Sequence, residues 1–356
     1  MAARRCSHCG QEILEANVRR ERAPPGQMAW SNKLGQPLVV LGAVPPTDKY
    51  YGEFVNEITD FHVTFAESVL HRDNILVIVP ERHSHVFREH LPADTLLHLQ
   101  DDLQMADIWM RDFSPVGMRQ QIIFKYRPNY QKANTSHYIQ NRLTGAIRAI
   151  VGSGSALLPK QSALIVDGGN VVDNHIDKAI LCARVNSDNK GKHVNEIKQQ
   201  IRNLLNYDHV AVIPDEGTRT GHADGMCAFI DDDVIAISAH LDAQIKGVWR
   251  KFESACGLHV NSVMTDQYLY VPVFGHDQRN TGQSRMLDEK VLDKIVENTT
   301  KTVVPVEVDQ KICRMGGNIR CLSWQVAGPL ADAFIKKARA DAKKYDAKFK
   351  EAVEPL

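Results

Sequence analysis

The sequence of 356 residues has no apolar run that approaches the roughly 18 residues of a membrane-spanning helix. Its first eight residues also lack the apolar core of a secretory signal. Neither charge predominates, because Lys and Arg together number 43 and Asp and Glu together also number 43. Such a balance creates no overall positive field that attracts nucleic acid or an anionic membrane. We therefore expect a soluble cytoplasmic protein that binds neither.

Cysteine is scarce as well. The chain has seven cysteines, an odd number in a sequence long enough to bury a sizeable core without disulfides. This count favours a reducing compartment over a disulfide framework. Cys6 and Cys9 have the Cys-x-x-Cys spacing of half a zinc site, but no second close pair follows. Two alternatives remain: a structural zinc completed by a distant residue or another subunit, and an extension with two reduced thiols.

Residues 1–30 differ in character from the remainder, because they combine this cysteine pair with a charged stretch and the breaker pair Pro24-Pro25. We predict an N-terminal extension over 1–30 and one globular domain over 31–356. The last helical stretch is amphipathic, and it either docks on that domain or forms a contact in a homo-oligomer.

From about residue 37, short apolar runs alternate with helical stretches, which is typical of an α/β protein. Residues 231–233, Asp-Asp-Asp, separate two strand-like runs and predict an antiparallel hairpin, so the sheets should be mixed. Helices are predicted over 191–206, 286–298 and 329–351. Strands are predicted over 38–41, 75–79, 122–124, 164–166, 210–213, 227–230, 234–237, 269–273 and 303–306.

Four polar segments carry the groups with chemical potential. They read Trp-Met-Arg-Asp at 109–112, Asp-Gly-Gly-Asn at 167–170, Gly-His-Ala-Asp-Gly at 221–225 and Gly-Gly-Asn-Ile-Arg-Cys at 316–321. Together they supply one thiol, one imidazole and at least three carboxylates. This is the equipment for attack by a thiolate on a cationic carbon, and a guanidinium held by carboxylates presents such a carbon.

The four segments, in this order, resemble the motifs of the agmatine deiminase and bacterial-type peptidylarginine deiminase family, which read Trp-x-Arg-Asp, acid-Gly-Gly, Gly-His-x-Asp and Gly-Gly-x-x-x-Cys. A fifth stretch that ends at Asn261 is similar to the family's strand-associated Asn segment. The resemblance covers about 35–327. It implies that residues 31–356 form a guanidine-modifying catalytic domain with the pentein fold, an α/β-propeller of about five ββαβ units around a pseudo-fivefold axis.

The sequence departs from the family pattern at several positions, which bear on the substrate more than on the type of reaction. Phe113-Ser114-Pro115 replaces Thr-Gly-Pro, and Asp167 stands where Glu is common. Arg320 precedes the cysteine where His or Asn is usual, and Gly225 replaces an Asn.

The resemblance assigns catalytic roles to five residues. Cys321 is the nucleophile, and His222 is the general acid for the departing ammonia and then the general base for water. Asp112 and Asp224 hydrogen-bond the guanidinium of the substrate. Asp167 orients His222.

Trp109, Asn261 and Gly317 complete the predicted substrate-binding set, together with Asp112 and Asp224. Arg111 is predicted to hold loops together. Arg320 receives no role, because neighbouring residues of a strand face opposite sides and Arg320 would therefore point away from Cys321.

Each predicted catalytic residue also has an ordinary structural alternative. Cys321 is then a core thiol, Asp112 pairs with Arg111, and Asp167 and Asp224 are turn acids.

The resulting hypothesis is an enzyme that hydrolyses agmatine to N-carbamoylputrescine and ammonia, in polyamine biosynthesis, with no cofactor and no active-site metal. A protein-arginine or free-arginine deiminase that forms citrulline is the first alternative. A non-catalytic interaction protein on the same fold is the second.

Overall fold

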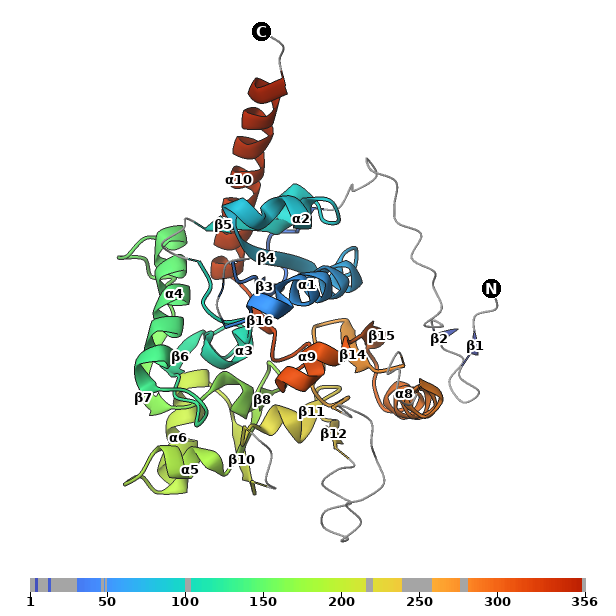
Figure 1. Ribbon diagram of the computed structural model, residues 1–356. Coiled ribbons are helices and arrows are strands. Elements are labelled where there is room, and N and C mark those ends of the chain that lie inside the picture. The colour runs from blue at the N-terminus through green and yellow to red at the C-terminus, as the bar shows by residue number, and fades with distance from the viewer. Residues whose placement is uncertain are drawn as a thin grey trace.

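The computed structural model describes residues 4–5, 12–13, 31–45, 48, 50–99, 104–215, 220–238, 258–275 and 281–353. Cys6 and Cys9, on which the prediction of a structural zinc rests, lie outside the described residues. The described chain has mixed α/β structure, as predicted (Figure 1). No helix within those ranges has the length and apolar character needed to cross a membrane.

The strands form small sheets. Strands β1 (Arg4–Arg5) and β2 (Glu12–Ile13) pair with each other. The largest sheet has the order β16–β3–β4–β5, from β3 (Leu38–Gly42), β4 (Asn74–Pro80), β5 (Leu96–Leu99) and β16 (Ser323–Val326). Two of the other sheets described have two strands each: β6 (Ile122–Lys125) pairs with β7 (Lys160–Ile165), and β11 (Cys227–Phe229) pairs with β12 (Ile235–Ile237). A three-stranded sheet has the order β10–β9–β8, from β8 (Val171–Asp173), β9 (Lys178–Cys182) and β10 (His209–Ile213). Another has the order β13–β14–β15, from β13 (Val263–Met264), β14 (Tyr268–Val273) and β15 (Thr302–Glu307).

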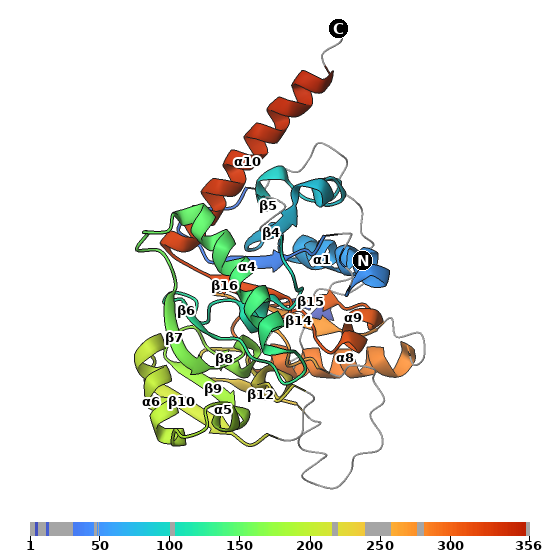
Figure 2. The same ribbon diagram turned by 60° about the vertical axis from the view of Figure 1, so that its left-hand side comes forward.

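Helices cover and connect these sheets (Figure 2). Two short 3-10 turns, η5 (Gly168–Asn170) and η6 (Ala223–Gly225), lie within two of the polar segments. The helices are α1 (Val55–Val69), α2 (Ser84–Arg88), α3 (Met110–Phe113), α4 (Ala133–Val151), α5 (Arg184–Asp188), α6 (Val194–Leu205), α8 (Thr281–Val296), α9 (Gln310–Met315) and α10 (Pro329–Val353).

Three of the sheets share one connection pattern, in which an antiparallel strand pair is followed by a helical crossover to a parallel strand. Strands β8 and β9 are antiparallel, and β9 continues through α5 and α6 to the parallel strand β10. The same pattern joins β13, β14, α8 and β15, and also β16, β3, α1 and β4. The hairpin predicted around residues 231–233 is confirmed, because β11 and β12 pair antiparallel on either side of it.

The core lies on both faces of the largest sheet, where every residue of β3 and β4 is buried. Because side chains of a strand alternate between faces, a strand covered on both sides reads as a continuous apolar run. One face packs against α1, through Val39, Leu41, Ile75, Val77 and Val79 with Ile58, Phe65 and Val69. The other packs against α4 and α10, through Leu38, Val40, Leu76 and Ile78 with Leu143, Ile147 and Phe334.

The start of α10 docks on the domain. Leu330, Phe334 and Ala338 are buried, and the ring of Phe334 meets that of Trp324 edge-on, with the centroids 5.5 Å apart. The far end of the helix projects from the body of the molecule (Figure 1). Because Trp324 belongs to β16, this docking anchors the strand that follows the predicted nucleophile.

Candidate active site

Cys321 lies in the turn between α9 and β16 and is 9% exposed. Asn261 holds this turn: its Oδ1 atom accepts hydrogen bonds from the backbone N–H groups of Arg320 (3.1 Å) and Cys321 (3.2 Å). Its Nδ2 group lies 3.2 Å from the Cys321 sulfur and also donates to the backbone carbonyl of Asp224 (3.3 Å). The side chain predicted to bind substrate is therefore engaged with the nucleophile and its turn.

The thiol of Cys321 donates a hydrogen bond to Asp224 Oδ2 at 3.7 Å. Burial, followed by the charges of Asp224 and Asp112, raises the pKa of Cys321 well above its usual value. These charges favour a neutral thiol at Cys321. A cation that binds Asp224 reverses part of this effect, because opposite charge favours the thiolate.

Two carboxylates flank His222, which is 2% exposed. Its Nε2 atom lies 3.2 Å from Asp167 Oδ2, and its Nδ1 atom lies 3.6 Å from Asp112 Oδ1. Burial alone would lower the pKa of His222, but the charges of Asp112, Asp167 and Asp224 raise it to about 9. The imidazole is thus protonated at neutral pH, which is the state in which it carries a proton that it can donate.

Asp112 lies in α3, where its Oδ1 atom accepts from the Gly169 N–H (3.2 Å) and its Oδ2 atom accepts from the Tyr130 hydroxyl (3.4 Å). Burial raises the pKa of Asp112 to about 7, with His222 opposing the rise and Asp224 adding to it. The carboxyl therefore changes its charge near neutral pH.

Arg111 has the structural role predicted for it. Its Nη2 group donates to Gln325 Oε1 (2.8 Å), and its backbone N–H donates to the carbonyl of Cys321 (3.0 Å). These bonds tie α3 to Cys321 and to strand β16. Burial, followed by the charge of Arg320, lowers the pKa of Arg111 to about 10, so it remains a cation at neutral pH.

The premise that placed Arg320 in a strand was wrong, because the strand begins only at Ser323. Arg320 is 3% exposed and points into the protein, with Nε 3.9 Å from Asp224 Oδ2 and Nη2 3.8 Å from Asp173 Oδ1. It also donates to the carbonyl of Val171 (2.8 Å). A buried guanidinium therefore lies beside a carboxylate predicted to bind substrate.

Glycines let these groups converge. A Cβ atom on Gly168 would lie 1.9 Å from the carbonyl oxygen of Arg111, and one on Gly317 would lie 2.2 Å from the ring of Trp109. The predicted residues Trp109 and Gly317 are thus in direct contact. A larger residue at Gly168 would push η5 away from α3, and one at Gly317 would push the turn that carries Cys321 away from Trp109.

Sequence reasoning missed three residues that contact the predicted set. Arg184 forms an ion pair with Asp167 at 2.9 Å, and Tyr130 donates to Asp112. Asp107 accepts from the Tyr51 hydroxyl (2.5 Å) and from the backbone N–H groups of Ile108 and Trp109 (2.7 and 3.3 Å), which shapes the segment that carries Trp109. No motif contains Arg184 or Tyr130.

The other cysteines lie apart from this chemistry. Cys182 and Cys227 are buried free thiols, and burial raises their pKa values to about 11 and about 12. Cys313 in α9 is disulfide-bonded, which differs from the expectation of reduced thiols.

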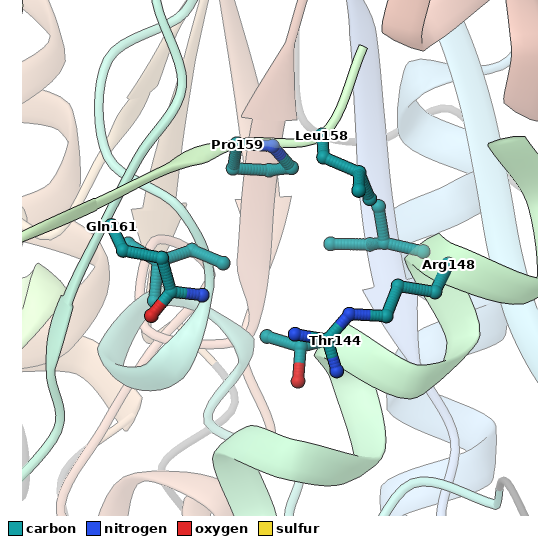
Figure 3. Close-up of a pocket in the computed structure, with 7 residues that line it drawn as sticks. Thr144, Arg148, Leu158, Pro159 and Gln161 are labelled. Carbon is teal, nitrogen blue, oxygen red and sulfur yellow. The ribbon is translucent and has the colours of Figure 1, made fainter. Parts of the chain in front are cut away.

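A pocket beside α4 is separate from the cluster around Cys321. Figure 3 shows its lining, which includes Thr144 and Arg148 from α4 and Gln161 from β7. None of the predicted site residues lines it. Among the residues that the structure describes, no group of three or more His, Cys, Asp or Glu side chains is arranged to hold a metal ion.

A family model described as Porphyromonas-type peptidyl-arginine deiminase matches residues 38–251, more than half of the chain. The chain belongs to this deiminase family. The resemblance inferred from the motifs is thereby confirmed. The matched residues include Asp112, Asp167, His222 and Asp224 and end before Asn261 and Cys321. No curated protein sequence matches the chain.

Solved structures of agmatine deiminases have the same fold as this deiminase-family chain. The agmatine deiminase of C. jejuni is 15% identical, with a TM-score of 0.64 over 84% of this chain and 94% of its own. That of Enterococcus faecalis is 16% identical, with a TM-score of 0.57 over 83% of this chain and 94% of its own. Both likenesses extend beyond the residues that the family model matches, and family membership supports an enzyme that acts on the C–N bonds of guanidino groups.

Proposed function

We propose that this protein is a hydrolytic guanidine deiminase that acts through Cys321. The observation that carries the proposal is the convergence of the thiol, the imidazole and two carboxylates on one buried position. A Cβ atom added to Gly169 would meet Asp112 Oδ1 and His222 Nδ1 at 2.6 Å each and Asp224 Oδ2 at 3.1 Å. Asp224 in turn accepts from Cys321.

The first half of the reaction follows from these contacts. The substrate guanidinium replaces the thiol as the hydrogen-bond donor to Asp224 and also bonds to Asp112, which orients its central carbon toward the sulfur. The thiol of Cys321 gives its proton to solvent, because the bound cation stabilises the thiolate. The thiolate attacks that carbon, so that a C–S bond forms and the C=N electrons move to nitrogen. Protonated His222 gives its proton to the departing nitrogen, the C–N bond breaks, and ammonia leaves an S-alkylthiouronium on Cys321.

The second half returns the enzyme to its starting state. His222, now neutral, removes a proton from a water molecule as that water attacks the thiouronium carbon. The C–S bond breaks, Cys321 leaves as thiolate and is reprotonated, and the product carries a ureido group. This sequence needs no metal and no cofactor.

Agmatine is the substrate that we propose first, with N-carbamoylputrescine and ammonia as products. Two features support a small guanidino compound: Cys321 is only 9% exposed, and Trp109 offers an aromatic surface beside Gly317. The description of the family model supports the alternative, an enzyme that converts arginine in peptides to citrulline. Free arginine is the third candidate.

Three finer expectations complete the proposal. We propose that the sheets surround a pseudo-fivefold axis as in penteins, which the repeated antiparallel-then-crossover pattern supports. We also propose a cytoplasmic enzyme that acts as a monomer or homo-oligomer. A non-catalytic protein on the same fold is less well supported, because such a protein has no need of a complete set of thiol, imidazole and carboxylates.

An ammonia-release screen tests the function. The wild-type protein is incubated with agmatine, free arginine, arginine peptides and small guanidines, and the Cys321→Ala and Cys227→Ala variants are run beside it. We expect one guanidino class to release ammonia, Cys321→Ala to be inactive, and Cys227→Ala to retain activity, because Cys227 is the matched buried thiol. A substrate adduct found on Cys227 by peptide mapping, or no turnover of any compound, would overturn the proposal.

A further inference from the structure

Arg184, the first residue of α5, contacts the carboxylate that holds the proposed acid-base residue. Its Nη2 group lies 2.9 Å from Asp167 Oδ2, the same oxygen that lies 3.2 Å from His222 Nε2. The side chains of Arg184, Asp167 and His222 are 7%, 1% and 2% exposed. One buried carboxylate oxygen is therefore shared between a permanent cation and the imidazole.

The same guanidinium also binds the backbone on both sides of the site. Its Nη1 group donates to the carbonyl of Thr220 (2.5 Å), two residues before His222, and its Nη2 group donates to the carbonyl of Arg127 (3.1 Å). The backbone N–H of Arg127 in turn donates to Asp167 Oδ1 (2.9 Å). Arg184 thus joins the segment after β6 to the segment that carries His222.

The chain passes over this side chain without room for a substituent. Gly221 has a φ of +68°, and a Cβ atom there would lie 2.7 Å from Cδ of Arg184. A positive φ strains any residue but glycine. The backbone immediately before His222 therefore rests on the aliphatic part of Arg184, while the charged end holds Asp167.

We propose that Arg184 is a positioning residue of the deimination reaction, which fixes the ring of His222 through Asp167 and limits how strongly Asp167 retains the imidazole proton. The inference rests on the proposed function. In that reaction, His222 must release its proton to the leaving nitrogen. An Asp167 without its cation would oppose this step, because its full charge would stabilise the imidazolium.

The charges around His222 determine the direction in which the loss of the Arg184 charge changes the pKa of His222. Three carboxylates outweigh burial and raise the pKa of His222 to about 9. Removing the positive charge of Arg184 from Asp167 raises this pKa further. The charged groups that face this region from the surrounding elements are Asp112 from α3, Asp167 before η5, Asp224 from η6, Arg184 and Asp188 from α5, Asp215 after β10 and Arg127 after β6.

Two substitutions separate charge from support. Arg184→Gln removes the charge and retains an amide that can donate to Thr220, whereas Arg184→Lys retains the charge. Arg142→Gln on α4, where the guanidinium stacks on Tyr138 at 4.8 Å, is the matched control. Thermal unfolding first establishes that each variant is folded, and Arg184→Met, a neutral side chain of similar reach, carries the test if Arg184→Gln does not fold.

The deciding measurement is an NMR titration of His222 in the full chain without substrate, so it does not depend on the substrate having been identified. We expect Arg184→Gln to raise the pKa of His222 by about one unit, and Arg184→Lys and Arg142→Gln to leave it unchanged. A fall toward about 6.5, the ordinary value for histidine, in either Arg184 variant would show that Arg184 only supports the loop. No change in Arg184→Gln would also overturn the proposal.

A second readout links the residue to turnover. With a substrate that the wild type accepts, Arg184→Gln should lower kcat more than it raises KM, and Arg184→Lys should restore part of the loss. An equal effect of Gln and Lys would overturn the role of the charge. If the wild type turns over no guanidino compound, the proposed function fails, while the titration of His222 still decides whether Arg184 controls its proton.

Discussion

The backbone of Gly169 lies so close to His222 that a Cβ atom at this glycine would be 2.6 Å from the Nδ1 atom of the imidazole. The same atom would lie 2.6 Å from Asp112 Oδ1. The N–H of Gly169 also donates to that oxygen at 3.2 Å. The side chains of His222 and Asp112 therefore both pack directly against the backbone of Gly169.

Replacement of Gly169 by Ala should separate these two side chains and reduce kcat/KM by about 100-fold, the scale expected when a catalytic group is displaced by about 1 Å. Gly154→Ala is the matched control, because a Cβ atom there meets nothing within 4 Å. Steady-state kinetics of both variants check the prediction. Equal activity in the two variants would mean that the site can relax around the added methyl group.

Binding of a guanidinium should weaken as the pH falls below about 7. Burial raises the pKa of Asp112 to about 7, so that below this pH the carboxyl becomes neutral and loses its attraction for a cation. The loss should approach about tenfold in affinity per pH unit. Isothermal titration calorimetry measures this dependence, with agmatine as the ligand and assays run at pH values from about 5.5 to about 8.5. The Cys321→Ala protein is used, because it is expected not to convert the ligand during the measurement.

The control for this dependence is the double variant with Asp112→Asn, which has no carboxyl to titrate at that position. Its affinity should be low and nearly independent of pH over the same window. A steep dependence that survives Asp112→Asn would assign the titration to a different group.

Replacement of Asp224 by Asn should make the free thiol more reactive while it impairs catalysis. The charge of Asp224 raises the pKa of Cys321, so its removal increases the fraction of thiolate and the rate of alkylation by iodoacetamide at pH 8. Turnover should fall, because one of the two guanidinium-binding carboxylates is lost. Asp232→Asn is the control, since Asp232 is an exposed carboxylate that lies 3.8 Å from Lys301 and contacts none of the candidate site residues. Slower alkylation in Asp224→Asn would contradict the arrangement described.

His62 should make the folded protein sensitive to acid. It lies in α1, is 1% exposed, and neither ring nitrogen has a hydrogen-bond partner in the structure. Burial lowers its pKa from 6.5 to about 4, so folding favours the neutral ring. The free energy of unfolding is therefore not reduced by His62 above pH 6.5. It falls as the pH drops from 6.5 toward 4, by about 3 kcal/mol in total, because the unfolded chain binds the proton more tightly.

Denaturant unfolding at several pH values measures this loss. His62→Leu should flatten the dependence of the unfolding free energy between pH 6.5 and pH 4, while His137→Gln, at an exposed position on α4, should leave it unchanged. An unchanged slope in His62→Leu would show that the buried ring is not the group that titrates.

The sequence predicted the strands that combine length with a continuous apolar run, such as β4 and β14. It did not predict β8 and β9, because Val171–Asp173 and Lys178–Cys182 are short and lie beside polar residues. Nor did it predict α1, in which buried Thr59 and His62 interrupt the apolar face. These elements are stabilised by neighbours distant in sequence, which a local pattern does not contain.

The residues of the candidate site also divide into those that a local sequence pattern predicts and those that it does not. Cys321 and His222 could be predicted because their motifs bring glycines with them, and glycine marks a close approach of backbone. Arg184 and Tyr130 carry no such marker, since each reaches its carboxylate through a single long side chain. Arg320 fails the strand rule for another reason: β16 begins at Ser323, so Arg320 lies in the preceding turn, where neighbouring side chains do not alternate between two faces.

Strand β16 also sets the order in which the chain can be completed. Its residue Val326 pairs with Leu38 of β3, so β3 completes its pairing only with a strand that is distant from it in the sequence. During synthesis, β3 therefore lacks one neighbour until residues 323–326 have left the ribosome, and pairings so distant in sequence form slowly. Because Cys321 lies two residues before β16, its thiol leaves the ribosome together with that strand, and we expect the candidate site and the largest sheet to form in the same step.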